Sequence, residues 1–174
     1  MRIENKDLVL RDVNKKDCET LERWWNDGEV MAHAGFPNGL GTNCEEIWES
    51  VSKDEDFLRR RLMIEYKNEL IGEMSYTFID DHCADLGIKI CEKEYQNMGL
   101  GRVALSMLIN RLFEMGCLKI VLDTNLNNMR ARHVYELLGF EKVRVNYDSW
   151  KDQMGNFQSS VDYELYRERF NDFS

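Results

Sequence analysis

The chain has 174 residues, of which 43% are apolar and 32% are charged, and its formal net charge is −9. This length and apolar content suit one domain, residues 1–174, that is large enough to bury its own core. The excess of acidic residues argues against a nucleic-acid binder, and no apolar run approaches the ~20 residues that span a membrane.

Cysteine usage and the N-terminal residues indicate the compartment. The five cysteines are scattered, and none belongs to a CxxC pair or a Cys/His cluster, so we expect free thiols and no metal site. The N-terminal segment carries charges but lacks the apolar stretch of a secretory signal. Together these features predict a cytoplasmic protein.

Alternating and helical patterns in the first half of the chain predict a strand, two helices and then three antiparallel strands. In chain order they span residues 8–13, 15–26, 43–51, 62–66, 70–78 and 84–90. Asn43 begins the second helix with a capping-box pattern. Between the two helices, residues 35–41 contain three glycines and the only proline, which suggests a binding loop.

The second half of the chain is predicted to form two further helices, a buried strand and a final hairpin. These elements span residues 100–115, 118–122, 128–138, 141–150 and 159–166. Gly116 and Gly139 follow the two helices in the position where a left-handed cap is common. The order of all elements predicts an α+β fold with a mixed, mostly antiparallel sheet flanked by helices.

The turn at residues 95–102, between a strand and the long helix, is the first feature that indicates a ligand. Gly99 and Gly101 let a ligand approach helix amides that have no partner within the helix. The helix dipole adds partial positive charge, and Arg102 adds a guanidinium, so the turn can bind an anionic phosphate. Glycines that serve only the geometry of the turn are the alternative.

Two other phosphate-binding motifs do not fit this turn. No Gly-Lys-Ser/Thr sequence follows the glycines, which excludes a Walker A loop. The dinucleotide-binding fingerprint has three glycines and opens a parallel βαβ unit, whereas here the preceding strand ends an antiparallel series.

Two segments together resemble the GNAT superfamily of N-acetyltransferases. Gln-Asn-Met-Gly-Leu-Gly at residues 96–101 is similar to its Q/R-x-x-G-x-G/A signature, and residues 128–140 resemble its N-x-x-A-x-x-x-Y-E-x-x-G-F helix. The order of elements matches over nearly the whole chain, best over residues 62–145. The N-terminal L-x-L-R-D strand, the tryptophans of the first helix and the final hairpin most resemble the branch that acetylates ribosomal-protein N-termini and polyamines.

The resemblance implies direct transfer of an acetyl group from acetyl-CoA to a neutral amine within a ternary complex. It implies that the phosphate turn, the end of the preceding strand and the start of a later helix bind the CoA moiety. These residues are Gln96, Asn97, Met98, Gly99, Leu100, Gly101, Arg102, Ile88, Lys89, Ile90 and Asn128. The strand residues would pair through their backbone with the pantetheine arm, and Asn128 also suits a helix N-cap.

The resemblance assigns Tyr135 to the leaving thiolate, which a phenol with a pKa of about 10 can protonate. Periodicity alone places Tyr135 on the apolar stripe of its helix, as a core aromatic. An acceptor amine must first lose a proton, and a carboxylate can take it. Glu73 is our first candidate for this base and Asp85 the second, although both also suit the solvent face of a sheet. His33 and His82 are further candidates in loops.

The acceptor is not specified by any motif. We expect a polyamine, a peptide N-terminus, an aminoglycoside or another small amine, and a homodimer is possible. Trp24, Trp25 and Trp48 either shape the acceptor pocket or lie in the core. A non-catalytic acyl-CoA-binding module or sensor, and a binder of nucleotide phosphates that uses the same turn, are the competing functions.

Overall fold

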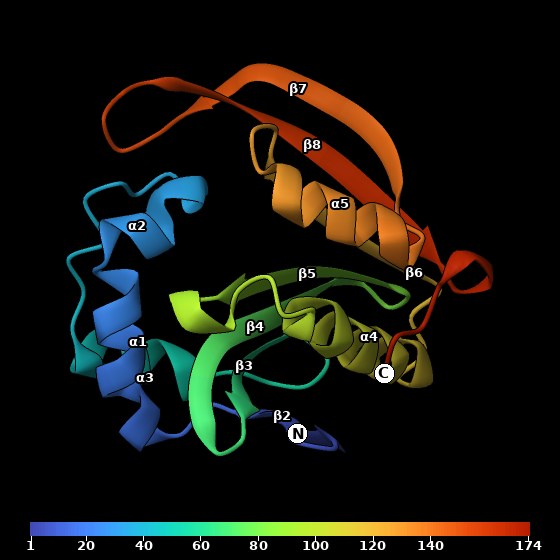
Figure 1. The fold of residues 1–174 in the computed structure, drawn as a ribbon, viewed down its shortest axis with the longest axis horizontal. Coiled ribbons are helices and arrows are strands. Elements are labelled where there is room, and N and C mark those ends of the chain that lie inside the picture. Colours follow the sequence, from blue (N-terminus) through green and yellow to red (C-terminus); the bar gives the residue numbers. More distant parts are fainter.

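The computed structural model describes residues 1–174 as one mixed sheet of eight strands with five α-helices (Figure 1). The strands are β1 (Arg2–Asn5), β2 (Leu8–Asp12), β3 (Arg59–Tyr66), β4 (Glu69–Asp80), β5 (Cys83–Ile90), β6 (Lys119–Asn125), β7 (Glu141–Lys151) and β8 (Phe157–Tyr166). The helices are α1 (Cys18–Trp25), α2 (Gly28–Met31), α3 (Cys44–Val51), α4 (Leu100–Glu114) and α5 (Met129–Leu138). None of these helices is long and apolar enough to cross a membrane.

The strands follow the order β1-β2-β3-β4-β5-β6-β8-β7, and every neighbouring pair is antiparallel except β5 and β6. The parallel pair is short: residues 83–85 of β5 meet residues 119–121 of β6. Beyond these residues the two strands are no longer paired, although β5 continues to pair with β4 as far as Ile90. The side of β5 that faces β6 is therefore left without a strand partner over its second half.

Helices pack on both faces of the sheet. The larger core, of 25 buried residues, joins α4 and α5 to alternate strand residues such as Ala84, Leu86 and Ile120. The smaller core, of seven buried residues, joins α1 and α3 to Met63 on the opposite face. Figure 1 shows α1, α2 and α3 on one side of the molecule and α4 and α5 on the other.

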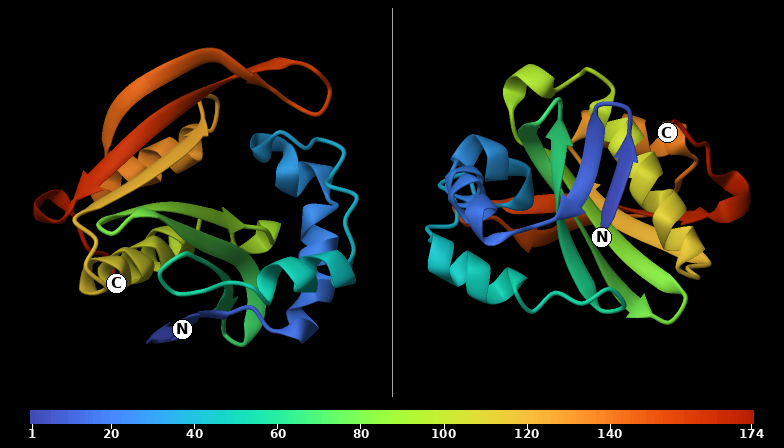
Figure 2. Two further views of the ribbon diagram at one scale, coloured as in Figure 1. Left: turned by 180° about the vertical axis from the view of Figure 1, so that it is seen from behind. Right: turned by 90° about the horizontal axis from the view of Figure 1, so that it is seen from below.

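The hairpin β7–β8 extends beyond the sheet and reaches the loop after α2, as both Figure 1 and Figure 2 show. At its tip, the Gln153 main-chain N–H donates to the Gly35 carbonyl at 2.8 Å, and Gln153 Nε2 donates to the Gly39 carbonyl at 2.9 Å. The Trp150 ring lies so close to Gly35 that a Cβ there would approach it to 2.4 Å. Because Gly35 also has φ of 94°, only glycine fits this contact without strain.

The structure confirms the mixed α+β class and most of the expected elements. The glycine caps are as expected, with φ of 103° at Gly116 and 98° at Gly139. Asn43 caps α3 through Oδ1, which accepts from Glu46 N at 3.0 Å, but Glu46 accepts from the Thr42 hydroxyl and does not complete a capping box. The prediction of a single N-terminal strand was wrong, because β1 precedes it and pairs with β2. Strand β1 has only four residues, most of them polar, so no alternation reveals it.

Two further boundaries differ from the expectation. The helix expected over residues 15–26 begins with a 3₁₀ turn, in which Asn14 and Asp17 cap each other, before α1 starts at Cys18. The four-residue helix α2 and the 3₁₀ turn after it were not predicted, because such short elements have no measurable periodicity.

Candidate active site

A cleft of about 1760 Å³ opens where β5 and β6 separate. On the α4 side it is lined by the phosphate turn (residues 96–102) and by α5, and on the other side by Trp25, Glu73 and Trp150. The cleft is therefore accessible to groups from both faces of the sheet. Residues 88–90 of β5, whose outer edge has no strand partner, form its floor.

The phosphate turn presents a row of unpaired donors. Asn97 and Gly99 have φ of 62° and 78°, and helix α4 begins directly afterwards. None of the main-chain N–H groups of residues 97–102 donates a hydrogen bond within the protein. Alternation of left-handed and right-handed residues makes successive N–H groups converge into a concave anion site, and the positive end of the helix dipole lies there as well.

Gln96 fixes this turn to its neighbours through its side chain. Its Nε2 donates to the Ile90 carbonyl at 2.9 Å, and its Oε1 accepts from Arg130 Nη1 at 2.6 Å. The main-chain N–H of Gln96 donates to the Lys93 carbonyl at 3.1 Å. This amide is therefore already paired within the protein, and the free amides begin at Asn97.

Arg102 and Gly101 add to the anionic preference of the turn. Arg102 forms no ion pair and no hydrogen bond within the protein, and its Nη2 lies 3.8 Å from the position of a Cβ on Gly99. A Cβ on Gly101 would lie 3.6 Å from Ile90 Cγ1, which is an ordinary contact. The packing of the protein thus does not require glycine at position 101.

Tyr135 lies in α5 with a buried ring and a hydroxyl that has no protein partner. The ring is 5% exposed and makes edge contacts with Phe140 and Tyr163 at centroid distances of 5.9 and 5.8 Å. Tyr135 is one of the residues that line the cleft. Burial raises the pKa of the phenol above its ordinary value, so the hydroxyl keeps its proton at neutral pH.

Asn128 performs the structural role that its position suggests. Its Oδ1 accepts from the Ala131 main-chain N–H at 3.3 Å, which caps α5. The residue also lines the cleft, and its Nδ2 makes no hydrogen bond within the protein. The cap and a contact to a ligand are therefore compatible.

Glu73 is the carboxylate that the structure places in the cleft. Its side chain is 13% exposed, and its Oε1 accepts from Trp25 Nε1 at 2.8 Å and from Lys89 Nζ at 3.1 Å. No protein group donates to Oε2. Trp25 and Lys89 also line the cleft, so they hold one oxygen of Glu73 while the other is available to a water or a substrate.

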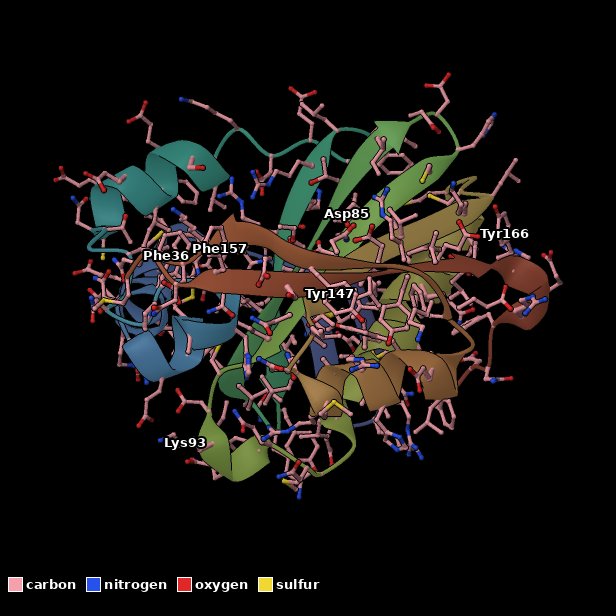
Figure 3. The ribbon with its side chains drawn as sticks, turned by 90° about the horizontal axis from the view of Figure 1, so that it is seen from above. Phe36, Asp85, Lys93, Tyr147, Phe157 and Tyr166 are labelled. Carbon is pink, nitrogen blue, oxygen red and sulfur yellow. The ribbon has the colours of Figure 1, made fainter.

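Asp85 occupies a different position. It pairs with Val121 in the last part of the parallel ladder, and it is not among the residues that line the cleft. Burial, followed by the charge of Asp123, raises the pKa of Asp85 to about 6. Figure 3 labels Asp85 and Lys93, which lie before and after residues 86–90, the part of β5 that does not pair with β6.

The remaining candidates, two histidines and three tryptophans, differ in whether they line the cleft. His33 is exposed and lines the cleft, whereas His82 lies in the turn between β4 and β5 and does not. Trp24 is a core residue, 1% exposed, with Nε1 donating to Glu92 at 2.8 Å. Trp48 packs at the edge of the smaller core, so of the three tryptophans only Trp25 belongs to the site.

Arg130, Asp123 and Trp150 are among the cleft-lining residues that the sequence did not reveal. Arg130 stands inside the motif at 128–140 but outside its defined positions. Asp123 lies within β6, one residue beyond the strand expected over residues 118–122. Trp150 belongs to a hairpin tip that meets the loop after α2. In Figure 3, Phe36 of that loop and Phe157 of the hairpin are labelled at the same end of the molecule.

All five cysteines are free, and only Cys91 lines the cleft. Burial raises the pKa of the Cys91 thiol well above its ordinary value, and it raises that of Cys117 to about 11. A protonated thiol is a poor nucleophile. The site thus contains no activated cysteine.

Curated proteins that resemble the chain include the following two. An uncharacterized N-acetyltransferase, YnaD of Bacillus subtilis, is 24% identical over 163 residues, which cover 88% of this chain and 94% of that protein. N-alpha-acetyltransferase 30 of Dictyostelium discoideum is 29% identical over 59 residues, so this match spans only 34% of the chain and 32% of that protein.

Solved structures share the whole fold. A spermidine N-acetyltransferase from Vibrio cholerae, in complex with CoA and spermine, has a TM-score of 0.82 and 22% identity, over 95% of this chain and 98% of the other. RimL, a ribosomal-protein α-N-acetyltransferase in complex with coenzyme A, has a TM-score of 0.85 and 17% identity, with the same coverage.

The family model for acetyltransferases of the GNAT type matches residues 18–140, which include the phosphate turn, β5, β6 and α5. This match extends over more than half of the chain. The sequence resemblance is thereby confirmed, and the chain belongs to the acetyltransferase (GNAT) family.

Proposed function

We propose that the protein is an N-acetyltransferase that transfers the acetyl group of acetyl-CoA directly to a primary amine. The observation that carries this proposal is the row of unpaired amides at residues 97–102, in one cleft with the free hydroxyl of Tyr135 and the free Oε2 of Glu73. Such a cleft offers a phosphate site, an acid and a base within one continuous volume.

Binding of acetyl-CoA would use donors that the protein itself leaves unsatisfied. The amides of residues 97–102, with the helix dipole and Arg102, suit the diphosphate. Gly101 supports this assignment, because its lack of a side chain has no use within the protein and keeps the approach to these amides open. The outer edge of β5 at residues 88–90 offers backbone groups to the amides of the pantetheine arm.

Chemistry would require the acceptor nitrogen to lose two protons and the leaving sulfur to gain one. Glu73 Oε2 accepts the proton of the incoming ammonium, directly or through a water, and leaves a neutral amine as the nucleophile. The amine nitrogen then forms a bond to the thioester carbon while the carbon–sulfur bond breaks. Tyr135, whose raised pKa means that the phenol is protonated at neutral pH, donates its proton to the departing thiolate. The nitrogen loses its second proton after the attack, and this proton restores the phenol once Tyr135 has protonated the thiolate.

The acceptor would enter from the face that carries Trp25, Glu73 and Trp150. An amine is a cation before it loses its proton, so indole rings and a carboxylate are suitable neighbours. The structural relatives act on spermidine and on a ribosomal protein N-terminus, which supports polyamines and peptide N-termini as the first acceptors to test. Aminoglycosides and other small amines complete the set.

The competing function, a CoA-binding module without turnover, has no use for an unpaired phenol beside the cleft. The test has two steps. Thermal unfolding with acetyl-CoA, ATP and NAD identifies the nucleotide, and we expect acetyl-CoA alone to raise the melting temperature. Release of free CoA thiol is then measured across polyamines, aminoglycosides, amino acids and basic peptides. Stabilisation by ATP or NAD instead, or no thiol release with any amine, would reject the enzyme assignment.

A further inference from the structure

The C-terminal segment of the chain, residues 170–174, is fixed between α4 and α5 (Figures 1 and 2). The main-chain N–H of Asn171 donates to the Leu138 carbonyl of α5 at 2.9 Å. The main-chain N–H of Phe173 donates at 2.9 Å to the hydroxyl of Ser106, a fully buried residue of α4. These bonds place Phe173 beside the first turn of α4.

Arg102 lies in this first turn of α4, and its guanidinium carbon is 4.3 Å from the centre of the Phe173 ring. Its Nε is buried and makes no hydrogen bond, and no carboxylate lies within ion-pair distance, although the chain contains 32 acidic residues. The guanidinium is thus held over the phosphate turn by an aromatic face alone.

This arrangement has a physical consequence for anion binding. A ring that stacks on the face of a guanidinium leaves its N–H donors free in the plane, where they suit phosphate oxygens. A free arginine side chain also loses rotamer freedom when it binds, and a stacked one has already lost it. Phe173 is 37% exposed, so its position does not follow from burial of the ring itself.

We propose that Phe173 is a positioning residue for the CoA moiety: it holds Arg102 over the phosphate turn so that the guanidinium binds a phosphate of the ligand. This inference rests on the proposed function, because it requires CoA as the ligand. The diphosphate and the 3′-phosphate of CoA share the chemistry that Arg102 recognises.

The test is a double-mutant cycle on CoA affinity, measured by calorimetry. Its variants are Arg102→Ala, Phe173→Ala and the double variant, with Phe57→Ala as the matched control. Phe57 is also an exposed phenylalanine, 71% exposed, that packs on another ring but lies outside the cleft. We expect Phe173→Ala to weaken binding about fivefold, in the range of one cation–π contact.

The cycle separates positioning from loss of structure. If Phe173 acts through Arg102, the double variant binds CoA as weakly as Arg102→Ala alone, Phe173→Tyr retains wild-type affinity, and Phe173→Leu does not. The KM for acetyl-CoA rises in Phe173→Ala while kcat at saturation stays unchanged. Repeating the cycle with 3′-dephospho-CoA identifies the phosphate, since the effect of Phe173→Ala disappears only if Arg102 meets the 3′-phosphate.

Three results would overturn the inference. These are wild-type CoA affinity in Phe173→Ala, additive losses in the double variant, and an equal loss in Phe57→Ala. If the wild-type protein itself does not bind CoA, the proposed function fails and the inference fails with it. The wild-type titration therefore distinguishes the two failures.

Discussion

At the scale of single residues, Tyr135 has a buried ring and an unsatisfied hydroxyl in the cleft. The variant Tyr135→Phe keeps the edge contacts with Phe140 and Tyr163 and removes only the hydroxyl. We expect the acetyl-transfer step to slow about 100-fold, as for loss of one general acid, while acetyl-CoA affinity is unchanged. A pre-steady-state measurement of this step avoids masking by product release.

Tyr163→Phe is the matched control for this prediction. The Tyr163 hydroxyl donates to Glu136 Oε1 at 3.0 Å and lies outside the cleft. The hydroxyl also accepts from Arg132 Nε at 3.4 Å, so its loss removes two hydrogen bonds. This should reduce the free energy of unfolding by about 1–2 kcal/mol and leave the transfer step unchanged. A transfer step at the wild-type rate in Tyr135→Phe would make Tyr135 a core aromatic only.

Glu73 carries a second prediction at this scale. Glu73→Gln keeps an acceptor for Trp25 Nε1 but cannot take up a proton. We expect kcat/KM at pH 7 to fall about 100-fold. The loss should diminish as pH rises toward the pKa of the acceptor, because the free amine then needs no base. A pH–rate profile with one amine acceptor measures both effects.

Asp85 is the competing base, and the same profile decides between the two carboxylates. If Glu73 is the base, Asp85→Asn retains most of the activity, since Asp85 does not line the cleft. A large loss in Asp85→Asn together with an active Glu73→Gln would reverse the assignment. In that case, proton transfer would pass through Asp123, which lines the cleft and contributes to the raised pKa of Asp85.

At the scale of elements, the phosphate turn is built from a left-handed residue, a glycine cap and the start of α4. The variant Gly101→Glu adds a carboxylate where the amides of residues 97–102 converge. We expect it to abolish measurable acetyl-CoA binding in calorimetry by repulsion and steric block, while the protein remains folded.

Gly101→Ala is the control for this variant. Its Cβ would make ordinary contacts with Ile90 at 3.6 Å and Ile88 at 3.8 Å, so the fold is expected to tolerate it. Helix propensity favours alanine over glycine by about 1 kcal/mol, and unfolding should show a small gain in stability. Unchanged acetyl-CoA affinity in a folded Gly101→Glu protein would contradict the assignment of the turn.

Elements were predictable from the sequence where their signals are local. The glycines at 99 and 101, the cap at Asn128 and the stripe of α4 all lie within one element and its flanks. Contacts between distant segments were not predictable: Trp25 meets Glu73 across 48 residues, and Gln153 meets Gly39 across 114. No local pattern encodes such pairs, because they depend on how the sheet turns and where the hairpin tip arrives.

At the scale of the whole molecule, the short parallel ladder between β5 and β6 determines where the cleft lies. Three paired residues hold the two strands together, and the sheet opens beyond them. The phosphate turn then faces the cleft from one side and Glu73 from the other. In the proposed reaction, acetyl-CoA and amine would approach from opposite faces and meet between the strands, so no acyl-enzyme is needed.

This architecture has a cost in stability that can be measured. Asp85 lies in the ladder just below the opening, where burial and the charge of Asp123 raise its pKa to about 6. In the unfolded chain an aspartate has a pKa of about 3.9. The folded state therefore binds this proton more tightly than the unfolded state, and Asp85 stabilises the fold when protonated and destabilises it when ionised.

The sign of the pH dependence follows from this difference. As pH rises from about 4 to above 6, Asp85 should lower the free energy of unfolding by roughly 3 kcal/mol, at about 1.4 kcal/mol for each unit of pKa difference. Asp85→Asn cannot ionise, so we expect it to be more stable than the wild type by about that amount at pH 7.5. The two proteins should become equal near pH 4. Urea unfolding of both proteins at these two pH values makes the comparison, because acidic groups that do not interact with Asp85 contribute equally to each. A stability difference that is the same at both pH values would mean that the effect of the substitution comes from packing and not from the charge of Asp85.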